Sequence, residues 1–173
     1  MFYKKIITAV SAVLISSLMF AQSPKLSDAD IAHIGVTANQ IDIDYAAIAQ
    51  KKSSNSEVVD FAKLMTKDHS AVIDQAVALV TRLGVTPTDN DVSKSLMEGA
   101  KAKQKEFSKL KGSGFDKAYL ENEVAYHKAV LETLKTTLIP SAKNSDLKEF
   151  LQALVAPFEG HLQHAEMALQ KIK

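Results

Sequence analysis

The adjacent residues Asp68 and His69 are the first part of the sequence that suggests chemistry. They lie in a segment whose apolar residues recur every three or four positions, which predicts an amphipathic helix with one buried face. These apolar residues are Ala62, Met65, Val72, Ile73 and Ala76. In this pattern His69 points into the core and Asp68 lies at its border. A titratable ring on a buried face needs a hydrogen-bond partner or serves as a ligand. We therefore expect other helices to place polar side chains next to His69.

Other helical segments supply such partners near their midpoints. His127 falls on an apolar stripe, His161 lies on or beside another, and Asp42 lies in the first segment. Helical bundles build metal sites from side chains that converge from facing helices. Neutral imidazole favours iron, zinc or copper, and added carboxylates favour iron or manganese. The sequence therefore predicts a polar core able to bind a transition-metal ion, with five candidate ligands: His69, His127, His161, Asp68 and Asp42.

The spacing typical of a di-iron carboxylate centre, a Glu three residues before a His on two helices, does not occur here. Glu123 precedes His127 by four residues, and Glu159 precedes His161 by two. The alternative to a metal site is a polar core in which the histidines pair with carboxylates or backbone groups. His164 is close enough to His161 to join either arrangement.

Composition limits the classes of function. The 173-residue chain has 46% hydrophobic residues, no cysteine, and 21 basic against 20 acidic residues. It therefore offers no thiol nucleophile, and it has no excess charge that would favour nucleic acid as a partner. Ser70 follows His69, but neighbouring helix positions point about 100° apart, so the two do not form a catalytic pair. These features favour a binding or structural protein over an enzyme.

Residues 1–21 have the pattern of a secretory signal peptide, because Lys4 and Lys5 precede an apolar stretch that ends at the small residue Ala21. We expect a short tail over residues 22–26 and a bundle domain over residues 27–173. The protein is therefore expected in the periplasm or otherwise exported, with membrane contact only if the signal segment is uncleaved. The oligomeric state is left open.

Helical periodicity and turn residues predict the elements that position the candidate ligands. A capping-box pattern at Ser27 and Asp30 begins a first helix over about residues 28–52. Ser56 is expected to cap a second helix, which ends near Gly84.

A shorter helix is predicted over about residues 92–110, closed by the run Gly112-Ser113-Gly114. A third long helix is expected from Phe115 to Pro140, and a last helix after residue 145, with a bend at Pro157. These elements predict an all-α fold: a ferritin-like four-helix bundle with an extra helix in the crossover between helices two and three. An up-down-up-down bundle with a decorated loop is the alternative.

The order of several motifs resembles the secreted bacterial domain-of-unknown-function family 4142 over about residues 27–169. The motifs are Ile43-Asp44-Tyr45, Phe61-Ala62, Asp68-His69, Phe115-Asp116-Lys117-Ala118-Tyr119-Leu120 with Val124 and His127, and His161-Leu162 with Ala165. The resemblance implies a ferritin-like bundle in the periplasm or cell envelope, with no established activity. It extends to Asp68, His69, Asp116, Tyr119, His127 and His161. The family usually has Glu where this chain has Asp42 and Asp44.

Three functions follow from these patterns. The first is an exported envelope protein, not an enzyme, whose polar core binds a transition-metal ion such as iron, zinc, copper or manganese. The second is a metal-dependent oxidase or peroxide-consuming enzyme of the ferritin-like kind, which needs an open coordination position. The third is a structural or stress-response interaction protein without a site.

Overall fold

The structure, a computed structural model, describes residues 25–172. The predicted signal peptide and residues 22–24 of the predicted tail lie outside the described residues. Within residues 25–172 the chain forms five helices and no strand, which confirms the predicted all-α class. The helices are α1 (Asp28–Lys52), α2 (Ser56–Arg82), α3 (Asp91–Lys109), α4 (Gly112–Thr133) continued by η1 (Leu134–Leu138) and α5 (Ile139–Ser141), and α6 (Ser145–Ala153) continued by α7 (Val155–Lys171).

The first two helices begin at side-chain caps. The Ser27 hydroxyl accepts a hydrogen bond from the Asp30 backbone N–H, and the Asp30 carboxylate accepts one from the Ser27 N–H, which confirms the predicted capping box. The predicted cap at Ser56 is wrong. Asn55 caps α2 instead, because its side-chain oxygen lies 3.0 Å from the Glu57 backbone nitrogen and satisfies that N–H.

The glycine-rich run after α3 was expected to end that helix, with the next helix beginning at Phe115, and both expectations are wrong. The α3 helix ends at Lys109, and Gly112 is already the first residue of α4. Gly112 has a φ of +54°, a conformation that glycine adopts without steric cost. The chain therefore reverses between α3 and α4 within a very short turn.

The two prolines of the C-terminal half affect their helices differently. The helix predicted to end at Pro140 continues to Ser141, because a π-helical segment, η1, precedes the proline and accommodates its missing N–H. The predicted bend at Pro157 is confirmed. It lies at Leu154, between α6 and α7, where the helical hydrogen bond that Pro157 cannot donate is absent.

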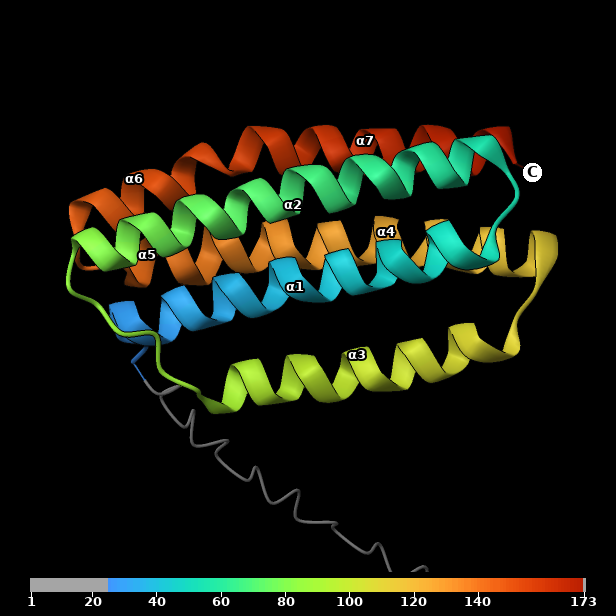
Figure 1. Cartoon of the computed structure of the whole chain (residues 1–173). Coiled ribbons are helices and arrows are strands. Elements are labelled where there is room, and N and C mark those ends of the chain that lie inside the picture. The colour runs from blue at the N-terminus through green and yellow to red at the C-terminus, as the bar shows by residue number, and fades with distance from the viewer. Residues whose placement is uncertain (1–24, 173) are drawn as a thin grey trace, which may run out of the picture.

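Four long helices, α1, α2, α4 and α6–α7, lie side by side, and α3 runs along the outside of α1 (Figure 1). The most extensive packing joins α1 to α2 and α4 to α7, and both pairs are antiparallel. The α2 and α4 helices run in the same direction, because α3 carries the chain back along the bundle between them (Figure 1). Packing between α1 and α4, like that between α2 and α7, is less extensive than in the two antiparallel pairs, and the line along which α1 meets α4 forms a seam.

A layer of polar side chains divides the core. One apolar cluster includes Phe61 and Met65, and the other includes Val72 and Phe158. His69 lies on α2 between Met65 and Val72, so it falls at the junction of the two clusters. The side chains of this polar layer are at most 7% exposed and come from all four long helices: Asp42, His69, Glu123, His127 and His161. No helix among the described residues is long and apolar enough to cross a membrane.

Candidate metal centre

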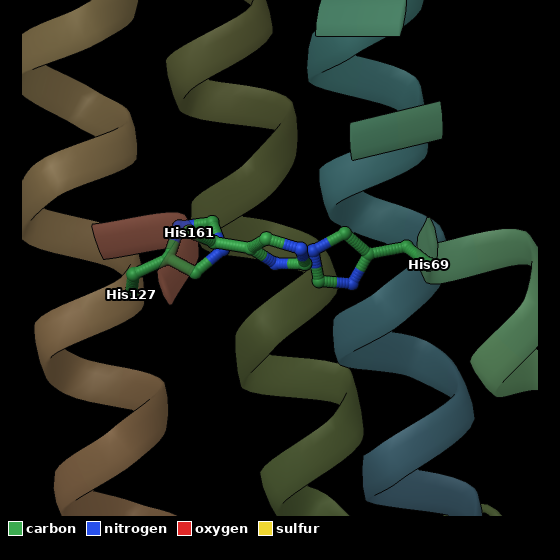
Figure 2. A group of neighbouring side chains, drawn as sticks. All are labelled: His69, His127 and His161. Carbon is green, nitrogen blue, oxygen red and sulfur yellow. The ribbon is translucent and has the colours of Figure 1, made fainter. Parts of the chain in front are cut away.

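Three histidines from three helices point toward one another in the polar layer (Figure 2). His69 comes from α2, His127 from α4 and His161 from α7. Their ring centroids are 5.2 to 5.6 Å apart. One nitrogen from each ring lies within 4.8 Å of a nitrogen from each of the other two. The predicted convergence of these three side chains is therefore present in the structure.

The protonation of His69 is fixed by Asn39 of α1. The Asn39 amide nitrogen donates to the Gly35 carbonyl at 2.8 Å, so the amide oxygen is the atom that faces the ring. That oxygen lies 2.7 Å from His69 Nδ1, and because it can only accept, Nδ1 carries the proton and donates. His69 Nε2 is left with a lone pair and has no hydrogen-bond partner among the described residues.

His127 is oriented by its own helix. Its Nδ1 lies 3.0 Å from the backbone carbonyl of Glu123, one turn earlier, so this nitrogen donates. The lone pair of the neutral ring is then on Nε2, which is buried and also lacks a hydrogen-bond partner in the described part of the chain.

His161 is held by Asp68. Its Nε2 donates to the Asp68 carboxylate at 3.0 Å, across the interface between α7 and α2. Its Nδ1 is buried without a hydrogen-bond partner within residues 25–172. All three rings therefore have one nitrogen committed as a donor and one lone pair directed into the core. Such hydrogen bonds from the outer nitrogen are what orient histidine ligands in metal sites.

Two buried carboxyl groups border the histidines. Asp42 Oδ2 lies 3.6 Å from His69 Nε2 and 3.8 Å from His127 Nε2. Two donor atoms bound to one ion at 2.0–2.2 Å in a tetrahedral site are about 3.4 Å apart, so this spacing is close to that of a coordination shell. Asp42, Glu123 and His127 also form a second group whose donor atoms lie within 4.8 Å of one another.

The environment favours the uncharged form of every group in the layer. Burial raises the pKa of Asp42 to about 7 and raises that of Glu123 well above its usual value, with the Asp42 charge as a further cause for Glu123. Burial, followed by the neighbouring histidines, lowers the pKa of His69 to about 2, and burial lowers that of His127 to about 4. A bound cation would be the neighbouring positive charge that keeps the buried carboxyl groups ionised. It would also be compatible with the neutral imidazoles, whose lone pairs can bind it.

The structure places four of the five predicted ligands together and separates the fifth. Asp42 and the three histidines face the same region, whereas the Asp68 carboxylate binds the outer nitrogen of His161 and is partly exposed. His164 packs edge-on against Phe61, with ring centroids 5.3 Å apart, outside both groups of potential ligands.

Two buried residues in or next to the polar layer are not among the five predicted ligands. Glu123 lies one helical turn before His127 on the same face, at the four-residue spacing already noted in the sequence, and the structure brings its carboxyl group within the second group of potential ligands. Asn39 gave no comparable signal, because its contact with His69 depends on how α1 and α2 are positioned against each other. Both side chains are buried.

Comparison with known proteins supports the resemblance noted in the sequence. The model of the family described as "Domain of unknown function (DUF4142)" matches residues 16–168, which is most of the chain. Curated proteins give no match, and solved structures give none either. The chain therefore belongs to the DUF4142 family.

Proposed function

We propose that the protein binds one transition-metal ion in the centre of the bundle. The observation that carries the proposal is the set of three buried ring nitrogens, His69 Nε2, His127 Nε2 and His161 Nδ1, each unpaired while the opposite nitrogen of its ring is hydrogen-bonded. Asp42 Oδ2 adds an oxygen donor that a bound cation would keep ionised, and Glu123 provides a second carboxyl group nearby. Buried polar atoms of this kind are rarely left without partners unless they serve a function.

The donor set selects among metals. Imidazole nitrogens with one or two carboxylates suit iron, manganese, zinc and copper(II), whereas the thiolates preferred by softer ions are absent, because the chain has no cysteine. Asn39 and Asp68 act as positioning residues, since they bind the outer nitrogens of His69 and His161.

We also propose that the bundle is ferritin-like and that the protein is exported. The parallel α2 and α4, with α3 between them in sequence, support a ferritin-like bundle with one long crossover. The N-terminal sequence pattern supports export to the periplasm or cell envelope through a signal peptide over residues 1–21. Cell fractionation with N-terminal sequencing of the mature protein tests the location. A cytoplasmic protein that retains Met1 would contradict it.

Metal analysis of protein purified without an affinity tag tests metal binding. After loading with iron, manganese, zinc or copper and removal of excess metal, we expect one ion per chain for at least one of these metals. His69→Ala and His127→Ala should each abolish stoichiometric binding, whereas His164→Ala should retain it, because His164 lies outside the cluster. Absence of stoichiometric metal in the wild-type protein under every loading condition would refute the proposal.

One observation favours a second function, that of a metal-dependent oxidase or peroxide-consuming enzyme. A cavity of about 10 Å³ is bordered by Asp42, His69 and His127, and this is roughly the space that one water molecule needs. Catalytic metals keep such an open position, where the metal acts as a Lewis acid or redox centre. Consumption of oxygen or peroxide by the iron-loaded protein tests this function. No turnover above that of His69→Ala would exclude it.

A further inference from the structure

The seam between α1 and α4 contains a pocket of about 190 Å³ that is separate from the space between the histidines. Its floor is formed by buried side chains from η1, α6 and α7, including Leu134, Leu151 and Phe158. Its mouth lies at exposed residues of α4, Ala129 and Thr133. The pocket therefore reaches from the surface into the core along the seam between α1 and α4.

The lining of this pocket offers no free polar group in its interior. Among the described residues that line it, only Asn39, Tyr126 and Thr133 have polar side chains, and none is charged. The Asn39 amide is committed to Gly35 and His69, and the Tyr126 hydroxyl donates to the Ala38 carbonyl at 2.8 Å. Because a charged ligand would lose its hydration without compensation, the lining selects an uncharged, apolar ligand.

The volume sets the size of that ligand. An apolar cavity of about 150 Å³ in another protein stays dry when empty and binds benzene. A pocket of about 190 Å³ is therefore large enough for an aromatic ring with a small alkyl substituent, or for a short branched aliphatic molecule. Longer chains would have to extend into solvent at Ala129 and Thr133.

The pocket is adjacent to the candidate metal centre. The small cavity bordered by Asp42, His69 and His127 shares five lining residues with it: Ala38, Asn39, Tyr126, Val130 and Phe158. A molecule in the pocket therefore lies one layer of side chains from the free nitrogens of His69 and His127.

We propose that the pocket between α1 and α4 is a binding site for a small, uncharged, apolar molecule beside the histidine cluster. Binding of such a molecule is a property separate from metal binding and does not depend on it. The apolar residues that line the pocket are not the proposed metal ligands. The site is therefore tested with metal-free protein.

Toluene is a suitable probe, and benzoate is its charged counterpart of similar shape. Titration of the metal-free protein, followed by NMR chemical shifts, should show saturable binding of one toluene per chain and no binding of benzoate. Ala129→Met places a larger side chain at the mouth, and Ala38→Leu does so at the junction with the small cavity. Both variants should weaken toluene binding at least tenfold.

Matched controls separate occlusion of the pocket from general perturbation. Ala125→Met enlarges another exposed position of α4, one turn before Ala129, and Ala47→Leu enlarges another half-buried position of α1. Neither residue lines the pocket, so both variants should bind toluene as the wild-type protein does. The exposed position of Ala129 keeps its variant informative if Ala38→Leu fails to fold. No saturable toluene binding, or equal binding by Ala129→Met and Ala125→Met, would overturn the proposal.

Discussion

The apolar cluster around Phe61 and the neighbouring polar layer lie in the same core but differ in how their groups are satisfied. In the apolar cluster, Phe61, Phe107 and Phe115 each pack against the Tyr119 ring, with centroids 6.2 to 6.3 Å apart. In the polar layer, three buried ring nitrogens lack a hydrogen-bond partner among the described residues, His69 Nε2, His127 Nε2 and His161 Nδ1, and the buried carboxyl groups of Asp42 and Glu123 can bond to each other only when one of them is protonated. The apolar cluster stabilises the fold by packing and leaves one such atom, the buried Tyr119 hydroxyl oxygen, without a partner in the described part of the chain, whereas the polar layer is incomplete without something that binds its ring nitrogens.

This difference separates residues that support folding from residues that support binding. An unsatisfied buried polar group costs about 1–3 kcal/mol, so a layer of them lowers the stability of the metal-free bundle. The apolar clusters on both sides offset that cost. Changes in the apolar cluster should therefore alter stability without altering the ligand, and changes in the polar layer should alter ligand binding first.

The largest effect on stability is expected from Phe61→Ala. Phe61 is fully buried, and removal of a buried phenylalanine ring lowers the free energy of unfolding by about 3–5 kcal/mol. Thermal and denaturant unfolding followed by circular dichroism measures this loss. Below the melting temperature the variant should still bind metal with the wild-type stoichiometry. Loss of metal in a fully helical variant would show that the two regions are not separable.

Metal should stabilise the wild-type protein, because it binds a site that the unfolded chain does not hold together. A free metal concentration of 100 times the dissociation constant raises the free energy of unfolding by about 2.7 kcal/mol, which is a shift of several degrees in the melting temperature. The shift should persist in His164→Ala and vanish in His69→Ala. Equal melting temperatures with and without metal in all three proteins would instead favour a structural protein without a site.

Asn39→Ala should weaken metal binding by about 10 to 100-fold, since it removes the acceptor that holds the His69 proton on Nδ1. Gln50→Ala is the matched control. Gln50 is also on α1 and also bonds to α2, through Thr66 Oγ1 at 2.8 Å, but it lies away from the histidines. Competition titration with a chromophoric chelator measures both affinities. Equal affinity in the two variants would show that Asn39 does not position His69.

The sequence predicted the inward direction of the ligands but not the contacts between helices. His69 and His127 were predicted correctly as buried residues, because helical periodicity alone determines which face a side chain occupies. The bond between Asp68 and His161, the contact of Asn39 with His69, and the pocket between α1 and α4 depend on the register and separation of helices. Those distances are set by the packing of the whole bundle, which no local pattern encodes.

The smallest expected effect is a pH dependence of the metal-free protein that belongs to the polar layer alone. Burial raises the pKa of Asp42 to about 7, so the folded protein holds this proton more tightly than the unfolded chain does. A raised carboxyl pKa stabilises the folded state at low pH, and this contribution is lost as the pH rises through the folded value. Burial lowers the pKa values of His69 and His127 to about 2 and 4, so these histidines make stability rise with pH until the unfolded chain is deprotonated, about one pH unit above its histidine pKa of about 6.5.

Between about pH 6.5 and 8 the Asp42 carboxyl group of the folded protein and the histidines of the unfolded chain both titrate, with opposite effects on stability, so comparison with a variant is needed to isolate Asp42. Across this range the Asp42 carboxyl group should lower the stability of the metal-free protein by about 1 kcal/mol, measured by denaturant unfolding at several pH values as the difference in pH dependence between the wild-type protein and Asp42→Asn. Asp42→Asn should reduce this loss, and Asp44→Asn should not, because Asp44 is exposed on the same helix. Saturating zinc should also remove the loss, since the metal binds the ionised carboxylate and its affinity rises with pH. An identical pH dependence of stability in the metal-free wild-type protein and Asp42→Asn would show that Asp42 is ionised without a cation, and the charge argument for a metal would fail.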